Sequence, residues 1–147
     1  THLITCEVTH APDLKTARAV SRSVVCSNLF KAAVFGRDAN WGRILCAIGY
    51  TPGDFSIDKV CVWLSSKAGE VYVCENAAYH PYSEDEAAKV LAEHDVLVKV
   101  DMGRKGMGLR SDLRLRQDQR RLPHLITLSG AARQLPRRGS LKRTTSS

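Results

Sequence analysis

The sequence predicts an α/β fold, a layered sandwich of helices on a mixed sheet, over residues 1–103. Stretches rich in β-forming residues alternate with amphipathic stretches along this region, which is typical of helices packed on a sheet. The chain has 147 residues, enough for one domain with its own core, and the region shows no internal repeat.

A change in composition predicts where this domain ends. Residues 1–102 hold 10 Lys and Arg against 13 Asp and Glu, whereas residues 103–147 hold 12 basic residues against 2 acidic ones. All nine aromatic residues lie in the first of these two regions. The net charge of +7 therefore comes from the last 45 residues alone, which predicts a disordered or weakly helical basic tail over residues 104–147.

The first part of the domain is expected to begin strand, helix, strand. Residues 2–9 are rich in β-formers with partial alternation, so they predict a strand. Pro12 and Asp13 suit the first turn of a helix that ends near Asn28. Its predicted apolar stripe consists of Leu14, Ala17, Val20 and Val24. The apolar segment 29–36 predicts a buried strand.

The second part is expected to continue helix, hairpin, helix, strand. A helix within residues 37–54 should begin near Asn40, with Asp38 or Asn40 as its cap. Residues 59–66 and 70–76 flank a short turn containing glycine, which predicts a β-hairpin.

The last two elements of the domain have clear boundaries. Ser83 with Glu86 fits a capping box ahead of an amphipathic helix over residues 84–95. Residues 95–102 alternate and predict a final strand. The predicted order is therefore β-α-β-α-β-β-α-β.

The cysteines and histidines do not form a recognisable metal or catalytic motif. The five cysteines are Cys6, Cys26, Cys46, Cys61 and Cys74. They are odd in number and contain no C-x-x-C pair, so we expect buried, reduced thiols and no metal or cofactor. The five histidines are His2, His10, His80, His94 and His124. They are widely separated, so each is expected to be a surface or capping residue.

Two further sites have a functional and a structural interpretation. Thr1 resembles an N-terminal nucleophile, but no glycine-rich loop lies nearby to hold an oxyanion, so the start of a fragment is the favoured interpretation. Asn40 and Arg43 would lie near a ligand in a functional interpretation of residues 36–45. The structural interpretation, in which Asp38 and Asn40 cap a helix and Trp41 packs, is favoured.

The basic tail has a nucleic-acid alternative. Arginine at high density supplies sequence-independent affinity for phosphates. The run over residues 114–122 is too short and irregular for a basic helix, and no aromatic residue is present there to stack on bases. We therefore expect no nucleic-acid partner. No run of about 18 apolar residues exists either, so no membrane span is expected.

The segment FGRDANWGRILCAIGY, residues 35–50, together with residues 1–20 and 96–103, resembles the ornithine acetyltransferase (glutamate N-acetyltransferase) family of arginine biosynthesis, called ArgJ. The resemblance covers residues 1 to about 103. It implies an α/β sandwich built from two chains of one self-cleaved precursor. It also implies transfer of an acetyl group from N-acetylornithine to glutamate through an acetyl-threonine intermediate, with backbone donors in an oxyanion hole.

The resemblance also implies that this chain lacks the family's catalytic residues. The nucleophilic threonine of the family follows a cleavage site in an A-T-M-L motif, which is absent here, and Thr1 corresponds to a different threonine. The family's substrate-binding glutamate lies just ahead of that position. We therefore expect a C-terminal piece of the β chain with no catalytic, cofactor or metal residue. It should be inactive without the α chain and the rest of the β chain, in an assembly expected to be a heterotetramer.

The end of the chain departs from the family pattern in an informative way. Members end in a sequence like A-W-G-C-D-L-T-Y-D-Y-V-K-I-N-A-D-Y-R-T, whose Asn and final Thr contact substrate. Residues 107–126 can be encoded by a set of allowed codons with a second meaning. When that nucleotide sequence is read one base later, it encodes W-G-C-D-L-T-Y-D-Y-V-K-I-N-A-D-Y-R-T followed by a stop codon. We infer a one-base displacement of the reading frame between about residues 102 and 107.

The remaining expectations concern location and substrate range. The chain does not begin with Met and shows no signal peptide, so its start is expected to be processed or missing. By resemblance, the protein is cytoplasmic, or in the mitochondrial matrix if the source is a fungus. Use of acetyl-CoA, which divides the bifunctional from the monofunctional members, stays open.

Overall fold

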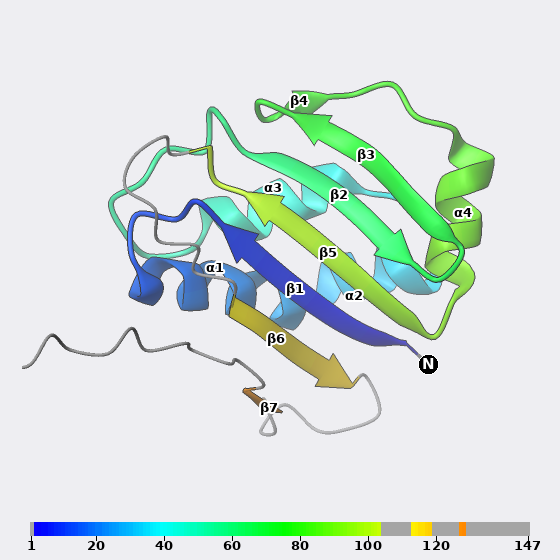
Figure 1. Cartoon of the computed structure of the whole chain (residues 1–147), viewed down its shortest axis with the longest axis horizontal. Helices are drawn as coiled ribbons and strands as arrows, with labels where there is room; N and C mark the ends of the chain where they lie inside the picture. The colour runs from blue at the N-terminus through cyan, green and yellow to red at the C-terminus, as the bar shows by residue number, and fades with distance from the viewer. Residues whose placement is uncertain (1, 104–112, 119–126, 129–147) are drawn as a thin grey trace, which may run out of the picture.

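The structure, a computed structural model, describes residues 2–103, 113–118 and 127–128 (Figure 1). Seven strands form one sheet in the order β4-β3-β2-β5-β1-β6-β7. The strands are β1 (Leu3–Thr9), β2 (Cys61–Ser66), β3 (Gly69–Glu75), β4 (Ala78–Tyr79), β5 (Asp95–Asp101), β6 (Leu113–Asp118) and β7 (Thr127–Leu128). The helices are α1 (Leu14–Cys26), α2 (Asn28–Phe35), α3 (Trp41–Gly49) and α4 (Glu84–Ala92).

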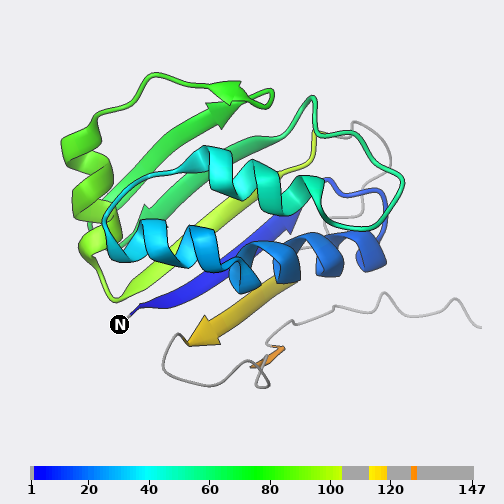
Figure 2. The same ribbon diagram turned by 180° about the vertical axis from the view of Figure 1, so that it is seen from behind.

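The sheet is mixed, and the described helices cover only one of its faces. Strands β1 and β5 are parallel, while the other neighbouring pairs are antiparallel. Alternate residues of the central strands are buried against the helices, and a single apolar cluster joins them to residues of all four helices. Figure 2 shows α1 and α2 following one another on this face, with α3 beside them. The predicted layered sandwich of helices on a mixed sheet is confirmed.

Side-chain caps fix where the helices begin. Asp13 caps α1, since its carboxylate accepts a hydrogen bond from the amide of Thr16 at 2.7 Å. That bond lowers the pKa of Asp13, because it stabilises the ionised carboxylate. The hydroxyl of Ser83 accepts from the amide of Glu86 at 3.3 Å and caps α4. Both predicted N-termini are confirmed, although Pro12 lies just outside the helix.

The predicted strand over residues 29–36 is wrong, because this segment forms helix α2. The Ser27 hydroxyl accepts a hydrogen bond from the Phe30 amide at 3.2 Å and starts a new helix directly after α1. Phe30, Ala33 and Val34 are the buried residues of α2, a spacing of three and four that fits a helical face. A short apolar run does not distinguish a buried strand from a buried helix. Here the Ser27 cap favours the helix.

Two smaller expectations also need correction. Leu14 is 44% exposed and lies outside the core, whereas the other three residues of the predicted stripe are buried. The two-residue strand β4 was not predicted. It follows a tight turn in which Asn76 and Ala77 both have positive φ, a conformation typical of hairpin turns.

Part of the basic tail pairs with the sheet. Strand β6 pairs antiparallel with β1, and β7 pairs antiparallel with β6. Residues 113–118 and 127–128 thus form short strands within the predicted tail, and the disorder of residues 104–147 stays a prediction. Backbone hydrogen bonds to a sheet edge do not require apolar side chains, which is why composition alone misses them. The rest of the predicted tail lies outside the described residues.

Candidate functional site

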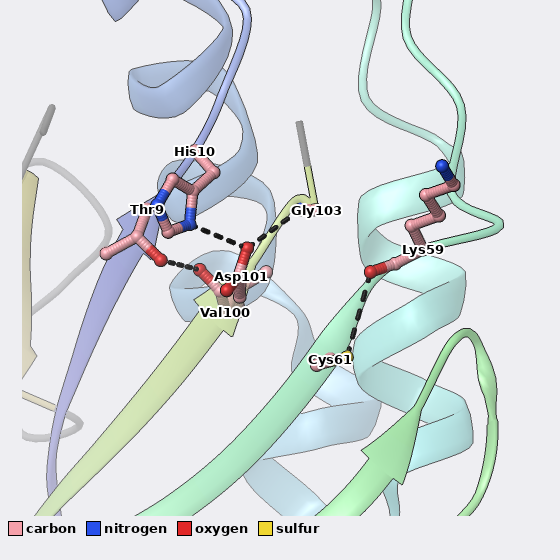
Figure 3. Close-up of polar contacts among 7 residues, drawn as sticks. All are labelled: Thr9, His10, Lys59, Cys61, Val100, Asp101 and Gly103. Atoms are coloured by element: carbon pink, nitrogen blue, oxygen red, sulfur yellow. Dashed lines mark hydrogen bonds and ion pairs between the residues drawn. The ribbon is translucent and has the colours of Figure 1, made fainter. Parts of the chain in front are cut away.

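The candidate site lies where the two parallel strands end. Strands β1 and β5 are in register from Leu3 opposite Asp95 to Thr9 opposite Asp101, so their carboxyl ends meet at one edge of the sheet. Strand β2 runs the other way, and its first residue, Cys61, lies opposite Asp101 (Figure 3). Ligands of open α/β sheets bind outside the carboxyl ends of strands, so this edge is where a ligand site is expected.

A small hydrogen-bonded cluster holds the ends of β1 and β5 together. Nδ1 of His10 lies 2.9 Å from Oδ1 of Asp101, and the amide of Gly103 donates to the same oxygen at 2.7 Å (Figure 3). The hydroxyl of Thr9 donates to the carbonyl of Val100 at 3.5 Å. His10 has a φ of +54°, a left-handed conformation that costs free energy in a residue with a side chain. The cluster fixes the geometry of this edge.

A cavity of about 410 Å³ opens beside this cluster. Its lining residues are Pro12, Asp54, Phe55, Ser56, Asp58, Lys59, Met102 and Gly103. Gly103 has a φ of +69°, and a β-carbon added to it would lie 2.6 Å from the β-carbon of Lys59. Only glycine lets the two backbone segments approach this closely, so the cavity wall depends on it.

The cavity carries charges of both signs. Asp54, Asp58 and Lys59 are all exposed, and within the described part of the chain none of their charged groups forms an ion pair or a hydrogen bond. The backbone that bears them is ordered by local bonds. The amide of Asp58 donates to the Ser56 hydroxyl at 3.1 Å, and the amide of Val60 donates to the Ile57 carbonyl at 3.0 Å. The cavity therefore offers unpartnered charges on a defined loop.

The polar residues of segment 36–45, for which a functional and a structural interpretation were open, make structural contacts. Asn40 caps α3 through a 3.1 Å bond from the Arg43 amide to its Oδ1, and its Nδ2 donates to Asp38 at 3.1 Å. The guanidinium of Arg43 donates to the Leu29 carbonyl at 2.7 Å and ties α3 to α2. Trp41 packs against the core. The favoured structural interpretation is confirmed for these contacts.

Aromatic rings surround the start of α3. The rings of Trp41 and Tyr79 are 6.4 Å apart, and those of Tyr79 and Tyr82 are 5.8 Å apart. Burial and the nearby carboxylate of Glu84 raise the pKa of Tyr82 to about 12. Its hydroxyl donates to the Ala39 carbonyl at 3.4 Å, so the neutral phenol acts as a structural donor.

Each described histidine has its own polar contact, and none of these contacts joins two histidines. His2 faces the Leu91 carbonyl at 2.9 Å, His80 the Tyr72 carbonyl at 3.0 Å, and His94 the carboxylate of its neighbour at 2.7 Å. His124 and Thr1 lie outside the described residues. Across the described ranges, no three His, Cys, Asp or Glu side chains cluster as a metal site would require.

The cysteines only partly match the predicted buried, reduced thiols. All five are free, but only Cys6 and Cys74 are buried, while Cys26 and Cys46 are exposed. Burial raises the pKa of Cys6 to about 12 and that of Cys74 to about 11, so both stay protonated at neutral pH. A protonated thiol is a poor nucleophile, which makes these two cysteines structural residues.

Comparison with known proteins decides the family. The sequence profile described as "ArgJ family" matches residues 1–113. The chain belongs to the ArgJ family. It is 47% identical over 102 residues to the arginine biosynthesis bifunctional protein ArgJ of Caldanaerobacter subterraneus subsp. tengcongensis, covering 69% of this chain and 25% of that protein. It is 41% identical over 111 residues to the mitochondrial ArgJ of Cryptococcus neoformans, covering 70% and 23% of the two chains.

A solved ArgJ structure has the same fold. The crystal structure of the arginine biosynthesis bifunctional protein ArgJ from Bacillus halodurans aligns with a TM-score of 0.63 at 35% identity. The alignment covers 69% of this chain and 46% of that one. The chain thus spans about a quarter of the length of the curated ArgJ relatives that it matches. None of these relatives has a name that indicates nucleic-acid binding.

Sequence reasoning missed the cavity at the carboxyl edge. The cavity draws on residues 12, 54–59 and 102–103, which lie far apart along the chain. The available signal was local: His10 and Asp101 each lie at the end of a predicted strand. Nothing in the sequence shows that these two strands are parallel neighbours. The proximity of His10 and Asp101 could therefore not be predicted.

Proposed function

We propose that this chain is part of an ArgJ enzyme that moves an acetyl group from N-acetylornithine to glutamate through an acetyl-threonine intermediate. Membership of the ArgJ family carries the proposal, and the motif at residues 35–50 is its most specific part. Splitting the transfer through a covalent intermediate replaces one difficult step by two easier ones. The nucleophile and its oxyanion donors belong, by resemblance, to other parts of the precursor. The chain alone is therefore inactive.

We place the substrate pocket at the edge where β1 begins. By resemblance, the family's substrate-binding glutamate precedes β1. Strand β6 ends at the same edge, with Asp118 opposite Leu3. In the displaced reading frame, the substrate-contacting Asn of the family falls at position 119. This edge is the opposite end of the sheet from the cavity beside Gly103.

The partner of this chain is the remainder of the same precursor, and it covers the open face of the sheet. Thr5, Trp63, Tyr72 and Leu97 are only half-buried, although each lies in a strand whose alternate residues are fully buried. Figures 1 and 2 show no described helix or strand over this face. The Trp63 and Tyr72 rings stack flat at 4.5 Å, which gives the face an apolar centre. Such a surface suits a second protein layer.

The basic tail is a frame-displaced copy of the family's ending. The ArgJ profile stops at residue 113, and residues 114–147 lie beyond it. In the displaced frame, positions 113–118 read Tyr-Asp-Tyr-Val-Lys-Ile, a β-forming sequence at the place of strand β6. We propose that the domain comprises residues 1–103 and that residues 104–147 form an out-of-frame extension, whose first ten residues the profile still matches. Resequencing the DNA that encodes residues 102–107 tests this proposal, and an unbroken reading frame there would refute it.

The cellular compartment proposed for the protein depends on the organism from which the chain comes. Relatives include bacterial ArgJ proteins and fungal ones named mitochondrial. A bacterial source implies the cytoplasm, and a fungal source implies the mitochondrial matrix. No helix in the described residues is long and apolar enough to span a membrane.

Reconstitution tests the proposed activity. The chain is co-expressed with the missing parts of an ArgJ precursor, once as written and once with residues 107–124 replaced by the displaced-frame ending. Acetyl transfer from N-acetylornithine to glutamate is expected only with the replaced ending, and none is expected from the chain alone. Activity of the chain alone, or no activity from the completed assembly, would refute the proposal. Adding acetyl-CoA as donor then decides whether the assembly is bifunctional.

A further inference from the structure

The three helices that lie along the sheet carry charge of one sign only. Helices α1, α2 and α3 contain no Asp or Glu, but they contain five basic residues, Lys15, Arg18, Arg22, Lys31 and Arg43. Residues 1–102 as a whole hold 13 acidic residues against 10 basic ones. A domain with net negative charge therefore places half of its basic residues, and none of its acidic ones, on this helix layer.

Three of these basic residues form a row on the outer side of α1. Lys15, Arg18 and Arg22 are three and four positions apart, a spacing that puts them on one face of a helix. All three are exposed, whereas Val20 and Val24 on the other side of α1 are buried in the core. Within the described residues, none of the three forms an ion pair. The row therefore presents its charges to solvent.

Exposed apolar side chains lie in the same layer. Leu29 and Phe35 on α2 are 64% and 73% exposed, and Tyr50, directly after α3, is 88% exposed. With Leu14 on α1, the layer holds four of the five large apolar residues that are exposed in the described chain. Figure 2 shows this layer from its outer side. Such a concentration of apolar groups marks a surface that contacts another molecule.

We propose that the outer side of this helix layer binds to the surface of an anionic lipid bilayer. The basic residues attract the anionic headgroups, and Leu29, Phe35 and Tyr50 enter the boundary between headgroups and acyl chains. Basic residues mixed with exposed apolar ones on one helical surface are typical of peripheral membrane binding. The remainder of the precursor is proposed to cover the other face of the sheet, so this inference does not depend on the acetyl-transfer proposal.

Charge and chemistry favour a bilayer over two other partners. A second copy of the chain would place two basic faces against each other, and like charges across an interface repel. Nucleic acid supplies phosphates for the basic row but no aliphatic region for Leu29 and Phe35. An anionic bilayer supplies both.

Binding is tested by co-sedimentation of the full 147-residue chain with lipid vesicles. One set of vesicles is phosphatidylcholine alone, and the other is an equimolar mixture of phosphatidylcholine and phosphatidylglycerol. Binding is expected with the anionic vesicles only, and raising the salt should weaken it because the charges are screened. Equal binding to both kinds of vesicle, or equally tight binding to duplex DNA at the same phosphate concentration, would overturn the proposal.

Charge variants locate the surface. The combined variant Lys15→Gln, Arg18→Gln and Arg22→Gln should bind anionic vesicles at least about tenfold more weakly. The matched control neutralises three exposed lysines outside these helices, Lys59, Lys67 and Lys89, in the same way. It should stay within about twofold of the wild-type chain. Equal losses in the two combined variants would show that net charge, and not this surface, causes binding.

The basic residues beyond position 103 require a separate control. The chain is also prepared with the displaced-frame ending in place of residues 107–147, which removes most of those charges. This form should still bind anionic vesicles, and it should lose that binding when the row on α1 is neutralised. Binding that disappears with the exchange of the ending alone would assign it to the tail and overturn the proposal.

Insertion of the apolar residues gives a second, positive readout. Phe35→Ser should weaken vesicle binding about threefold to tenfold. The fluorescence of Phe35→Trp should shift to shorter wavelength when anionic vesicles are added, because the new ring leaves water. Tyr79→Trp, an exposed position outside the three helices, is the control and should show no added shift. Circular dichroism confirms that each variant folds. The absence of a shift in Phe35→Trp while the chain is bound would refute insertion of α2.

Discussion

Nδ1 of His10 lies 2.9 Å from the carboxylate of Asp101, and this contact joins the ends of two parallel strands whose residues are 91 positions apart in the sequence. The same carboxylate oxygen accepts the amide of Gly103 at 2.7 Å. One side chain thus orders the end of β1, the end of β5 and the start of the segment that follows β5.

Two substitutions of Asp101 distinguish the contributions of its two contacts to stability. Asp101→Asn keeps an oxygen for the Gly103 amide and loses only the charge beside His10, so a loss of about 0.5 kcal/mol in the free energy of unfolding is expected. Asp101→Ala removes both contacts and should cost about 1.5 kcal/mol, because hydrogen bonds to charged groups are stronger than neutral ones. Urea denaturation measures both values. Equal losses for the two variants would show that the Gly103 bond contributes nothing.

Among the glycines that the structure describes, Gly103 is the one whose replacement should disturb the fold most. In Gly103→Ala the new methyl group would lie 2.6 Å from the Lys59 β-carbon and 2.7 Å from its carbonyl oxygen, at a φ of +69°. A loss of at least about 1–3 kcal/mol is expected from the backbone conformation and the clash together. Gly49→Ala is the control, since nothing lies within 4 Å of its added β-carbon. That variant should gain about 0.5 kcal/mol. Thermal or urea unfolding of the two variants measures these changes in the free energy of unfolding.

The motif at residues 35–50 could be interpreted from the sequence because its contacts are local. A cap and the residue that it caps are three positions apart, so Asn40 and Arg43 identify the start of α3 without any tertiary information. The same holds for Asp13 and for Ser83. Segment 29–36 shows where this reasoning fails: its residues are nearly all apolar, and Ser27, which caps α2, also ends α1.

The carboxyl-edge site could not be predicted for a different reason. Its residues become neighbours only because β5 pairs with β1, and the strand order of a sheet is decided by packing of the whole domain. The pairing of β6 with β1 also escaped prediction, because a basic, arginine-rich composition argues against a strand while backbone hydrogen bonding permits one. Local patterns therefore predicted most elements but not their neighbours.

The cap of α3 should have a measurable and specific effect on stability. Asn40→Ala removes the side-chain oxygen that accepts the Arg43 amide at 3.1 Å, and a loss of about 1 kcal/mol is expected. Asn40→Ser retains a capping oxygen and should recover most of that loss. Chemical denaturation compares the two. A Ser variant as unstable as the Ala variant would mean that the bond to Asp38, and not the cap, is what Asn40 contributes.

The buried thiol of Cys6 should make the protein lose stability as the solution becomes alkaline. The thiol is fully buried, and burial raises its pKa from 9.0 to about 12. Between these two pH values the unfolded chain has lost this proton while the folded chain still holds it. The unfolded state therefore binds fewer protons, and the free energy of unfolding falls with rising pH, by about 1.4 kcal/mol per pH unit for this group.

The contribution of Cys6 is isolated by its removal. Cys6→Ala eliminates the titrating group, so the variant should lose about 2 kcal/mol less than the wild-type chain between about pH 8.5 and about pH 10.5. Its stability at neutral pH will be lower because of the smaller side chain, but the comparison uses only the dependence on pH. Cys26→Ala is the control, since the Cys26 thiol is exposed in the folded chain. Urea denaturation under reducing conditions measures all three proteins. Parallel curves for the wild type and Cys6→Ala would show that the Cys6 thiol ionises as readily in the folded chain as in the unfolded one.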